Sequence, residues 1–282
     1  MRFVAALLFW LLTTVALAVA VPSMWAQHNV VDEGGYVALA QATATEQPMQ
    51  DAMASELTDQ LMTLAGNSGY DVSPDLMSGA ATSYTRSAAF PGQFASVNRI
   101  AHRWMFTDLV SQSDESGRWE IDLSPILADT SFQQTLRDFG INPPSTLTVP
   151  LTENVSDSLR PGQLRQLGTW GPWVSLGAAI LAGVFALLTF AAARRRGKAL
   201  AALGVSALLV GAAGWAAIEV LRRRIDQALD ATSDGIRQVA DAMVGHAVGS
   251  LHLWLNLTLA AGVVLVLLGV VAAMLGGLRR RD

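Results

Sequence analysis

The sequence contains no cysteine, and only 15% of its 282 residues are charged. Without cysteine the chain forms no disulfide, no thiolate nucleophile and no cysteine-ligated zinc or iron–sulfur site. The formal net charge is −4, so the strong basic surplus typical of nucleic-acid binding is missing as well. We therefore expect no nucleic-acid partner, and any folded domain must be stabilised by packing alone.

The motifs that mark common catalytic sites are also missing. The sequence has no G-x-S-x-G, Walker or GxGxxG motif, and no HExxH or other helix-spaced zinc pattern is formed by its four histidines, His28, His102, His246 and His252. We therefore predict a protein that is not an enzyme, with no catalytic residues, no cofactor and no metal. A pocket joining His102 to several carboxylates would contradict this prediction.

Apolar sequence is what the chain has in abundance. Hydrophobic residues make up 51% of the chain, and the mean hydropathy is +0.36. The excess lies in four segments of about 20 residues or more, the length at which an α-helix crosses roughly 30 Å of hydrocarbon. Two of them, between Trp170 and Glu219, flank a basic cluster from Arg194 to Lys198. Because Lys and Arg favour the cytoplasmic side of short loops, this turn is predicted to be cytoplasmic.

These segments predict the organisation of the chain. Residues 1–26 form an N-terminal transmembrane anchor, 27–168 an extracytoplasmic domain, and 169–220 a transmembrane hairpin. Residues 221–249 form an extracytoplasmic amphipathic helix, and 250–282 a fourth transmembrane helix with a short cytoplasmic tail. The prediction is a multi-pass plasma-membrane protein with both termini in the cytoplasm.

Two further patterns bear on this topology. Tryptophan prefers membrane interfaces, and five tryptophans fall near the predicted outer interface: Trp25, Trp170, Trp173, Trp215 and Trp254. Ala18-Val19-Ala20 has the composition of a signal-peptidase site, but the apolar run before it is longer than a usual signal segment. We favour an uncleaved anchor; cleavage would leave three spans and the same outer domain.

The segment 27–168 is predicted to be mainly helical. Apolar spacing, cap signals and prolines predict helices over about 32–45, 48–66, 73–89 and 94–113. Alternating residues predict two strands, at 118–123 and 147–151, which should pair because a lone strand leaves its backbone groups unpaired. The predicted fold class is a mainly α membrane protein: four transmembrane helices plus an extracytoplasmic helical domain with a small two-stranded β element.

Two groups of residues are candidates for interaction. Arg99, His102 and Arg103 lie near the core face of the helix predicted over 94–113. They would contact an anion or a lipid headgroup, or form only a solvated face with one hydrogen-bonded histidine. The second group is a heptad-like seam suited to packing against another helix. It comprises Ile225, Leu229, Thr232, Ile236, Val239 and Met243. An adjacent acidic stripe, Asp226, Asp230 and Asp234, is interpreted as an ion-paired solvated face rather than a divalent-cation site.

Glycines in the third and fourth spans predict close helix packing. Such small residues let two helix backbones approach each other within a membrane. They are Gly204, Gly211 and Gly214 in the third span, and Gly262, Gly269 and Gly276, spaced by seven, in the fourth.

Several short motifs occur in an order that resembles a group of actinobacterial integral membrane proteins, described generally only as conserved membrane proteins. The motifs are Phe94, Asn98-Arg99, Ala101-His102, Ile121-Asp122-Leu123-Ser124-Pro125, Gly140-Ile141, Val149-Pro150 and Arg194-Arg195-Arg196. The resemblance covers about residues 1–220. It implies a Gram-positive plasma membrane with the outer domain facing the cell wall, and it carries no activity.

The lengths of the segments on each side of the membrane limit where a functional domain can lie. The predicted cytoplasmic segments are only a few residues long, so function is expected outside or within the membrane plane. We predict a scaffold, accessory subunit or ligand-sensing module of the cell envelope, with the lipid bilayer, a membrane or envelope protein, or a second copy of the chain as partner. The alternative is a subunit of an oligomeric transporter or channel, although the spans offer almost no polar lining.

Overall fold

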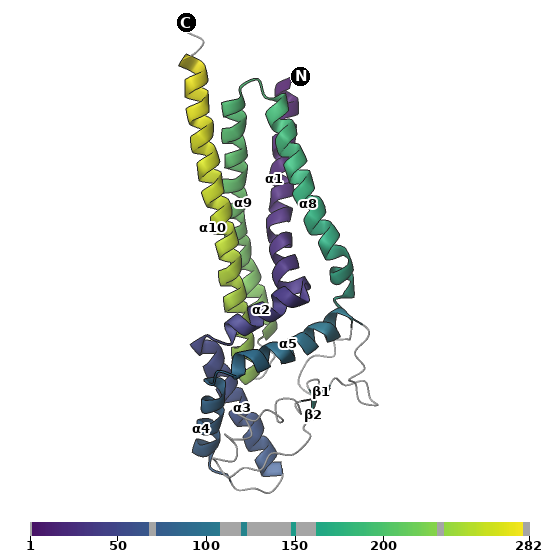
Figure 1. Cartoon of the computed structure of the whole chain (residues 1–282), viewed down its shortest axis with the longest axis vertical. Coiled ribbons are helices and arrows are strands. Elements are labelled where there is room, and N and C mark those ends of the chain that lie inside the picture. Colours follow the sequence, from purple (N-terminus) through teal and green to yellow (C-terminus); the bar gives the residue numbers. More distant parts are fainter. Residues whose placement is uncertain are drawn as a thin grey trace. The chain divides into compact units, whose positions relative to one another are not determined.

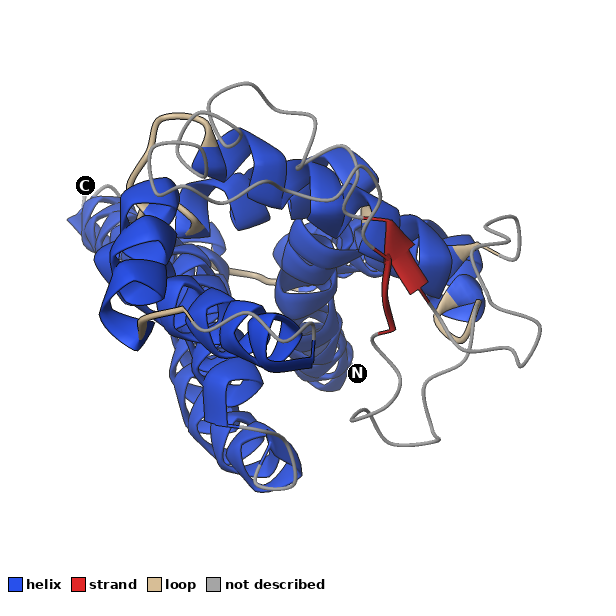
Figure 2. Cartoon of the chain, turned by 90° about the horizontal axis from the view of Figure 1, so that it is seen from below, coloured by secondary structure: helices blue, strands red, loops and turns tan. Residues whose placement is uncertain are grey.

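The structure is a computed structural model that describes residues 2–67, 72–107, 120–122, 148–150, 162–229 and 234–278. Figures 1 and 2 show a chain dominated by helices. The described elements are α1 (Arg2–Ala26), the π-helical turn η1 (Gln27–Val31), α2 (Glu33–Thr43), α3 (Gln47–Asn67), α4 (Pro74–Thr85), α5 (Phe90–Phe106), β1 (Glu120–Asp122), β2 (Thr148–Pro150), α8 (Arg165–Ala192), α9 (Arg196–Leu229) and α10 (Asp234–Leu278).

The chain divides into two compact units. The membrane unit comprises Met1–Asp32, Leu167–Ile225 and Ala247–Asp282. The α2–α5 unit comprises Glu33–Gln166 and Asp226–His246. The long helix α10 therefore contributes its first turns to the α2–α5 unit and the rest to the membrane unit.

Within the described part of the chain, four helices are long and apolar enough to cross a membrane. They are Phe3–Val31, Arg165–Ala192, Arg196–Gln227 and Gly235–Leu275. Their outward side chains include Leu187 and Trp173, which are 71% and 70% exposed. So large an apolar surface suits a hydrocarbon surrounding rather than water. The prediction of a multi-pass helical membrane protein is confirmed at this level.

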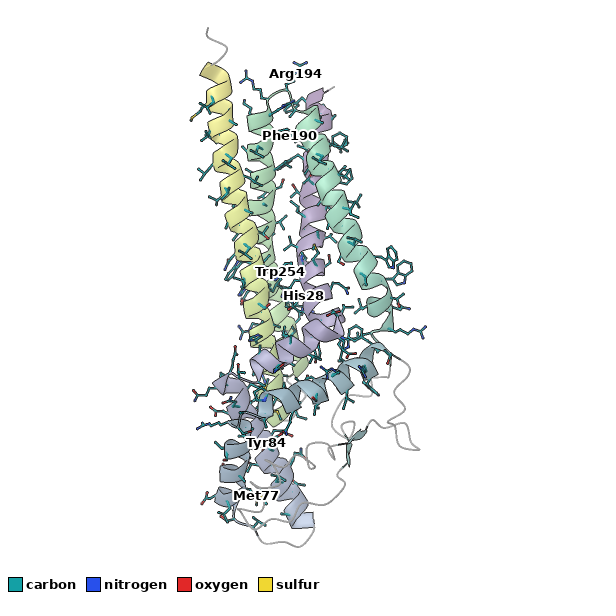
Figure 3. All side chains as sticks on the ribbon, in the orientation of Figure 1. His28, Met77, Tyr84, Phe190, Arg194 and Trp254 are labelled. Atoms are coloured by element: carbon teal, nitrogen blue, oxygen red, sulfur yellow. The ribbon has the colours of Figure 1, made fainter. Side chains whose placement is uncertain are left out.

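The α8–α9 turn, the start of α1 and the end of α10 lie at one end of the membrane unit (Figure 1). In Figure 3, Phe190 and Arg194 mark this end, and His28 and Trp254 lie toward the other. The turn is tighter than predicted, because α8 ends at Ala192 and α9 already begins at Arg196. Arg196 lies over the Phe190 ring, 6.0 Å from its centroid.

Helices α9 and α10 pack through glycines. A Cβ atom on Gly204 would lie 2.6 Å from the carbonyl oxygen of Gly262 and 2.7 Å from the amide nitrogen of Val266. A Cβ on Gly197 would lie 2.5 Å from the nitrogen of Ala273. These neighbours are backbone atoms, so the two helices are in backbone contact, and their pairing order is antiparallel. The predicted close approach is confirmed at Gly204 and Gly262, and likewise at Gly211, Gly214 and Gly269; the surroundings of Gly276 lie outside the described side chains.

Helix α1 joins the bundle through polar contacts. The indole Nε1 of Trp10 donates to the carbonyl oxygen of Ala202 at 2.8 Å, and the Thr14 hydroxyl donates to Ser206 Oγ at 2.8 Å. Ser206 is fully buried. In hydrocarbon such hydrogen bonds have no competing water, so they fix the position of α1 along α9.

The α2–α5 unit is built from two helix pairs, α2 on α5 and α3 on α4. Its main core holds Phe90, Tyr84 and Ala44, with Met53 and Leu57 packed against it. Met49 on α3 and Ala44 in the α2–α3 turn are fully buried. The Tyr84 hydroxyl also donates to Gln93 Oε1 at 2.5 Å, which connects α4 to α5.

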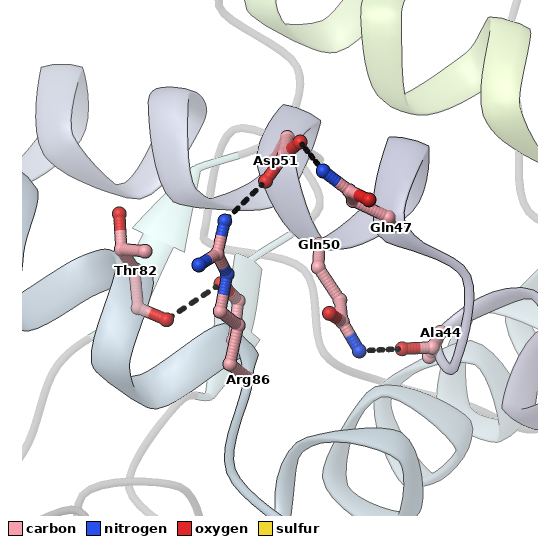
Figure 4. Close-up of polar contacts among 7 residues, drawn as sticks. Ala44, Gln47, Gln50, Asp51, Thr82 and Arg86 are labelled. Carbon is pink, nitrogen blue, oxygen red and sulfur yellow. Dashed lines mark hydrogen bonds and ion pairs between the residues drawn. The ribbon is translucent and has the colours of Figure 1, made fainter.

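Polar contacts connect the start of α3 with the end of α4 (Figure 4). Asp51 accepts a hydrogen bond from Gln47 at 3.4 Å and forms an ion pair with Arg86 at 3.3 Å. Gln50 donates to the carbonyl oxygen of Ala44 at 3.3 Å, across the α2–α3 turn. Both members of the Arg86–Asp51 pair are at least half exposed, so the pair stabilises the unit only weakly.

Several helix boundaries differ from the prediction. Helix α4 ends at Thr85 rather than Ala89, and α5 begins at Phe90 rather than Phe94. Helix α5 also ends at Phe106 rather than near Ser113. Pro91 explains the second difference, because it occupies the first turn of α5, where a missing N–H group removes no helical hydrogen bond. Ser73 precedes Pro74 as predicted, but its side chain makes no capping hydrogen bond.

The two strands form a short antiparallel pair (Figure 2). Glu120 pairs with Pro150, Ile121 with Val149, and Asp122 with Thr148. The remainder of both predicted strands lies outside the described residues. The small β element of an outer domain therefore stays a prediction.

The amphipathic helix predicted over 221–249 requires correction. Helix α9 continues without a break to Leu229, and a new helix, α10, begins at Asp234. Residues 222–229 contain no proline or glycine that would end α9, whereas Ser233-Asp234 is a helix-start composition. The apolar period continues across this boundary, so the periodicity alone could not reveal it.

A hydrogen-bonded turn at Gly162 precedes α8. Gly162 has φ 68°, a conformation that glycine adopts without strain. Its N–H donates to the carbonyl oxygen of Trp104 at 2.9 Å, and the Leu164 N–H donates to that of Met105 at 2.9 Å. Two backbone hydrogen bonds thus hold this turn against the end of α5.

Candidate functional site

The first candidate group lies where α5 packs on α2. Arg99 and Arg103 project from successive turns of α5 toward Glu33 at the start of α2. The Arg103 guanidinium donates two hydrogen bonds to this carboxylate, from Nε to Oε2 at 2.9 Å and from Nη2 to Oε1 at 3.0 Å. Arg99 Nε lies 3.5 Å from Oε1 of the same carboxylate. The predicted anion contact is thus occupied by a carboxylate of the chain itself.

This ion-paired layer has a clear electrostatic signature. The hydrogen bond from Arg103 lowers the pKa of Glu33, against a smaller opposing effect of burial, and the charges of Arg103, His102 and Arg99 lower it further. The same hydrogen bond raises the pKa of Arg103. The Arg103 and Glu33 side chains are 56% and 35% exposed. Solvent screening therefore limits the contribution of the pair to stability.

His102 belongs to a separate, buried layer. It is only 4% exposed. Its ring stacks on Phe106, with centroids 4.3 Å apart, and lies 5.2 Å from the Tyr36 ring. The Tyr36 hydroxyl donates to Asn98 Oδ1 at 3.2 Å, and burial raises the pKa of Tyr36. A histidine enclosed in this way has little access to a substrate in solution. Among the described residues, no group of three or more His, Asp or Glu side chains is placed to hold a metal ion.

A second set of contacts, which no sequence pattern predicted, joins the first turns of α10 to the α2–α3 region. His246 Nδ1 lies 2.7 Å from Glu46 Oε1. Gly235 lies against Glu56 so closely that any side chain at this position would overlap the Glu56 carboxylate. These residues are about 200 positions apart in the chain, and no local pattern connects them. A glycine directly after a helix-start signal was the only available hint.

The seam residues are divided between two helices. Ile225 and Leu229 lie on α9, whereas Ile236, Val239 and Met243 lie on α10. Thr232 lies outside the described residues. The three α10 residues are half-buried, and they lie on the segment that carries Gly235 and His246. The seam is therefore not a single continuous helix face, and its α10 part belongs to the α2–α5 unit.

The membrane unit contains a cavity of about 660 Å³. Residues from α1, α8, α9 and α10 line it, and all of them belong to the membrane unit. Representative lining residues are Thr13, Ala182, Ala207 and Trp254. No lining residue is ionisable. The cavity can therefore accommodate apolar groups but offers no charged path for an ion.

These features define the class of the chain: a multi-pass helical membrane protein with a second, mainly helical unit. No protein-family profile, curated protein or solved structure matches the chain.

Glu33→Gln is expected to weaken the acid dependence of stability. Because the folded pKa of Glu33 is lowered, its pair contributes stability that is fully present above the unfolded pKa of about 4.3. This contribution is lost as the pH falls through the folded pKa. The wild type should therefore lose stability more steeply than Glu33→Gln in this acid range, and the variant should be less stable at neutral pH by at most about 1 kcal/mol.

Thermal unfolding of the detergent-solubilised chain, from neutral pH into the acid range, measures this effect. Arg103→Gln is the matched variant, because it removes the donor and leaves the carboxylate. It should reduce the acid dependence in the same way. Acid dependence that stays at the wild-type level in both variants would show that the pair has no energetic role.

Proposed function

We propose that the chain is a non-enzymatic plasma-membrane protein of the cell envelope, acting as a scaffold, accessory subunit or ligand-sensing module through its α2–α5 unit. The supporting observation is the distribution of charge. The cavity between the membrane helices has no ionisable lining residue. In contrast, the α2–α5 unit carries ordered charged groups on its surface, such as Arg103 with Glu33 and Arg86 with Asp51.

The proposed topology puts the α8–α9 turn and both termini in the cytoplasm and the α2–α5 unit outside. Two observations support it. The turn, the start of α1 and the end of α10 lie at one end of the membrane unit (Figure 1), and Arg194, Arg195 and Arg196 lie in or beside the turn. Cytoplasmic loops carry such an excess of basic residues. The resemblance to actinobacterial membrane proteins further favours a Gram-positive envelope, with this unit facing the cell wall.

We further propose that α1 is retained as an anchor. Cleavage after Ala20 would remove Trp10 and Thr14, and with them the hydrogen bonds to Ala202 and Ser206. Ser206 would then have a buried hydroxyl without its partner on α1. We also assign the β1–β2 pair to a small sheet of the outer domain.

Single-cysteine labelling tests the topology, and the absence of native cysteine makes it clean. Ser96→Cys places a thiol at an exposed position of α5, and Ala193→Cys places one in the α8–α9 turn. A membrane-impermeant maleimide should label Ser96→Cys in intact cells, and Ala193→Cys only after the cells are permeabilised. The opposite pattern would place the α2–α5 unit in the cytoplasm and end the proposed envelope role.

Crosslinking in native membranes, followed by mass spectrometry, tests the interaction role. Ile236→Glu and Val239→Glu introduce charge at half-buried seam positions of α10, whereas Gln238→Glu does so at an exposed position and serves as the control. The seam variants should lose crosslinked partners or stability in detergent, and the control should keep both. If all three behave like the wild type, the seam is not a contact surface. Crosslinks solely between copies, together with solute flux, would favour the oligomeric transporter.

A further inference from the structure

The cavity between the membrane helices extends over one half of the bundle. On α10 its lining runs from Trp254 to Leu265, and on α1 from Thr13 to Met24. Each stretch covers eleven steps of helix, which at 1.5 Å per residue is about 16 Å. The hydrocarbon core of a bilayer is roughly 30 Å thick, so one leaflet contributes about half of that. The length of the cavity therefore matches the hydrocarbon depth of a single leaflet.

One end of the cavity coincides with an interfacial level. Trp254 lines this end, and the Trp25 indole donates to Ser250 Oγ at 3.2 Å one turn further along α10. Figure 3 shows Trp254 and His28 toward the same end of the bundle. Tryptophan prefers the boundary between hydrocarbon and headgroups. The other end of the cavity, at Thr13 and Leu265, then lies near the middle of the bilayer.

The lining offers few polar groups to water. Its two hydroxyl groups already donate to carbonyl oxygens of their own helices, Thr13 to Phe9 at 2.7 Å and Thr258 to Trp254 at 2.9 Å. A buried water needs two to four polar partners, and apolar cavities remain dry. An empty cavity would forfeit the dispersion contacts of its walls. The solvent that reaches the space between membrane helices is hydrocarbon.

Small side chains create this space. Ala20, Ala182 and Ala207 line the cavity, and their side chains are among the buried residues of the chain, at 3%, 6% and 7% exposure. They come from α1, α8 and α9, so the space is shared by three helices rather than lying on one helix face. A volume of about 660 Å³ is within the usual range of ligand pockets, about 300–1,000 Å³.

We propose that this cavity binds one acyl chain of a membrane phospholipid. The chain enters from the leaflet whose headgroups lie at the level of Trp25 and Trp254, and its end reaches Thr13 and Leu265. Under the topology proposed above this is the outer leaflet; the identity of the occupant does not depend on that topology. The site would make a lipid tail a structural part of the four-helix packing.

Photocrosslinking of the full-length chain tests the proposal. The protein is reconstituted in nanodiscs with a phospholipid that carries a diazirine in the middle of one acyl chain. After irradiation, mass spectrometry locates the adducts. In the wild type, adducts should concentrate on the cavity residues of α8 and α9, around Ala182 and Ala207. A free fatty acid bearing the same diazirine serves as a second probe and should label these positions several-fold less.

Two substitutions fill the cavity, and one control does not. Ala182→Leu fills its buried part, and Ala261→Leu fills it from an exposed lining position on α10, where a larger side chain is easier to accommodate. Ala212→Leu adds the same volume at an exposed position of α9. Elution as a single species and the melting temperature show which variants are folded; should Ala182→Leu not fold, Ala261→Leu decides.

The filled variants should lose the cavity adducts several-fold, and Ala212→Leu should keep them. Filled variants that retain wild-type labelling at Ala182 and Ala207 would overturn the proposal. So would wild-type adducts spread evenly over the outer faces of the four helices. Equal or stronger labelling by the free fatty acid would overturn the assignment to phospholipid.

Discussion

Gly204→Ala is expected to destabilise the membrane unit by about 1–3 kcal/mol or more, because overpacking usually costs this much. The added Cβ would lie 2.6 Å from the carbonyl oxygen of Gly262 and 2.7 Å from the nitrogen of Val266, and neither backbone atom can move without shifting α10. The sign is informative, because helix propensity alone favours alanine over glycine by roughly 1 kcal/mol. Melting in detergent and the yield of monodisperse protein measure the loss.

Gly177→Ala on α8 is the matched control for this experiment. Nothing lies within 4 Å of a Cβ atom at Gly177. The control should therefore be as stable as the wild type or slightly more stable. If Gly204→Ala and Gly177→Ala had the same melting temperature, the backbones of α9 and α10 would not be in contact, and the described pairing of these two helices would be wrong.

Phe90→Ala should cost the α2–α5 unit about 3–5 kcal/mol, which is the range for removal of a buried aromatic ring. Phe90 is 2% exposed. Its ring lies 5.7 Å from both the Tyr84 and the Phe94 rings, edge-on to the first. The ring therefore fills the centre of the main core, and alanine would leave a cavity there. Hydrogen exchange of peptides from α4 and α5 should rise strongly in the variant.

Leu76→Ala provides the comparison on α4. Leu76 is 50% exposed, so its truncation leaves no cavity, and we expect exchange close to the wild type. Similar exchange in the two variants would mean that the cluster around Phe90 is not the core that holds this unit together.

The elements that the sequence predicted well are those with a strong local signal. Each of these signals lies within one continuous stretch of sequence. They are the four apolar segments, the glycines of the third and fourth spans and the helix start at Ser73-Pro74. Helix boundaries were less accurate, because Pro91 is compatible with both a helix break and a first helical turn. The continuation of α9 to Leu229 was not predicted. Apolar residues that recur at alternating steps of three and four residues indicate a helix, but they do not indicate where one helix ends and the next begins.

The partners within the candidate site were beyond local patterns. Arg99, His102 and Arg103 were correctly placed on one helix, but Glu33, which forms ion pairs with both arginines, is about 70 residues away. A surface arginine and an ion-paired one have the same sequence signature. The same limit explains why the contacts of His246 with Glu46 and of Gly235 with Glu56 were not predicted. The cavity was equally hidden, because it arises from small residues on several separate helices.

The turn at Gly162 has a consequence for how this chain can change in evolution. Its hydrogen bonds to Trp104, and those of Leu164 to Met105, join the end of α5 to the approach to α8. These hydrogen bonds hold Trp104 and Met105 next to Gly162 and Leu164. Because the entropic cost of closing a loop grows only slowly with its length, by about 0.6 kcal/mol for each doubling, the two bonds can persist while the number of residues between Met105 and Gly162 varies. Insertions and deletions should therefore accumulate there, leaving the helices on either side in register.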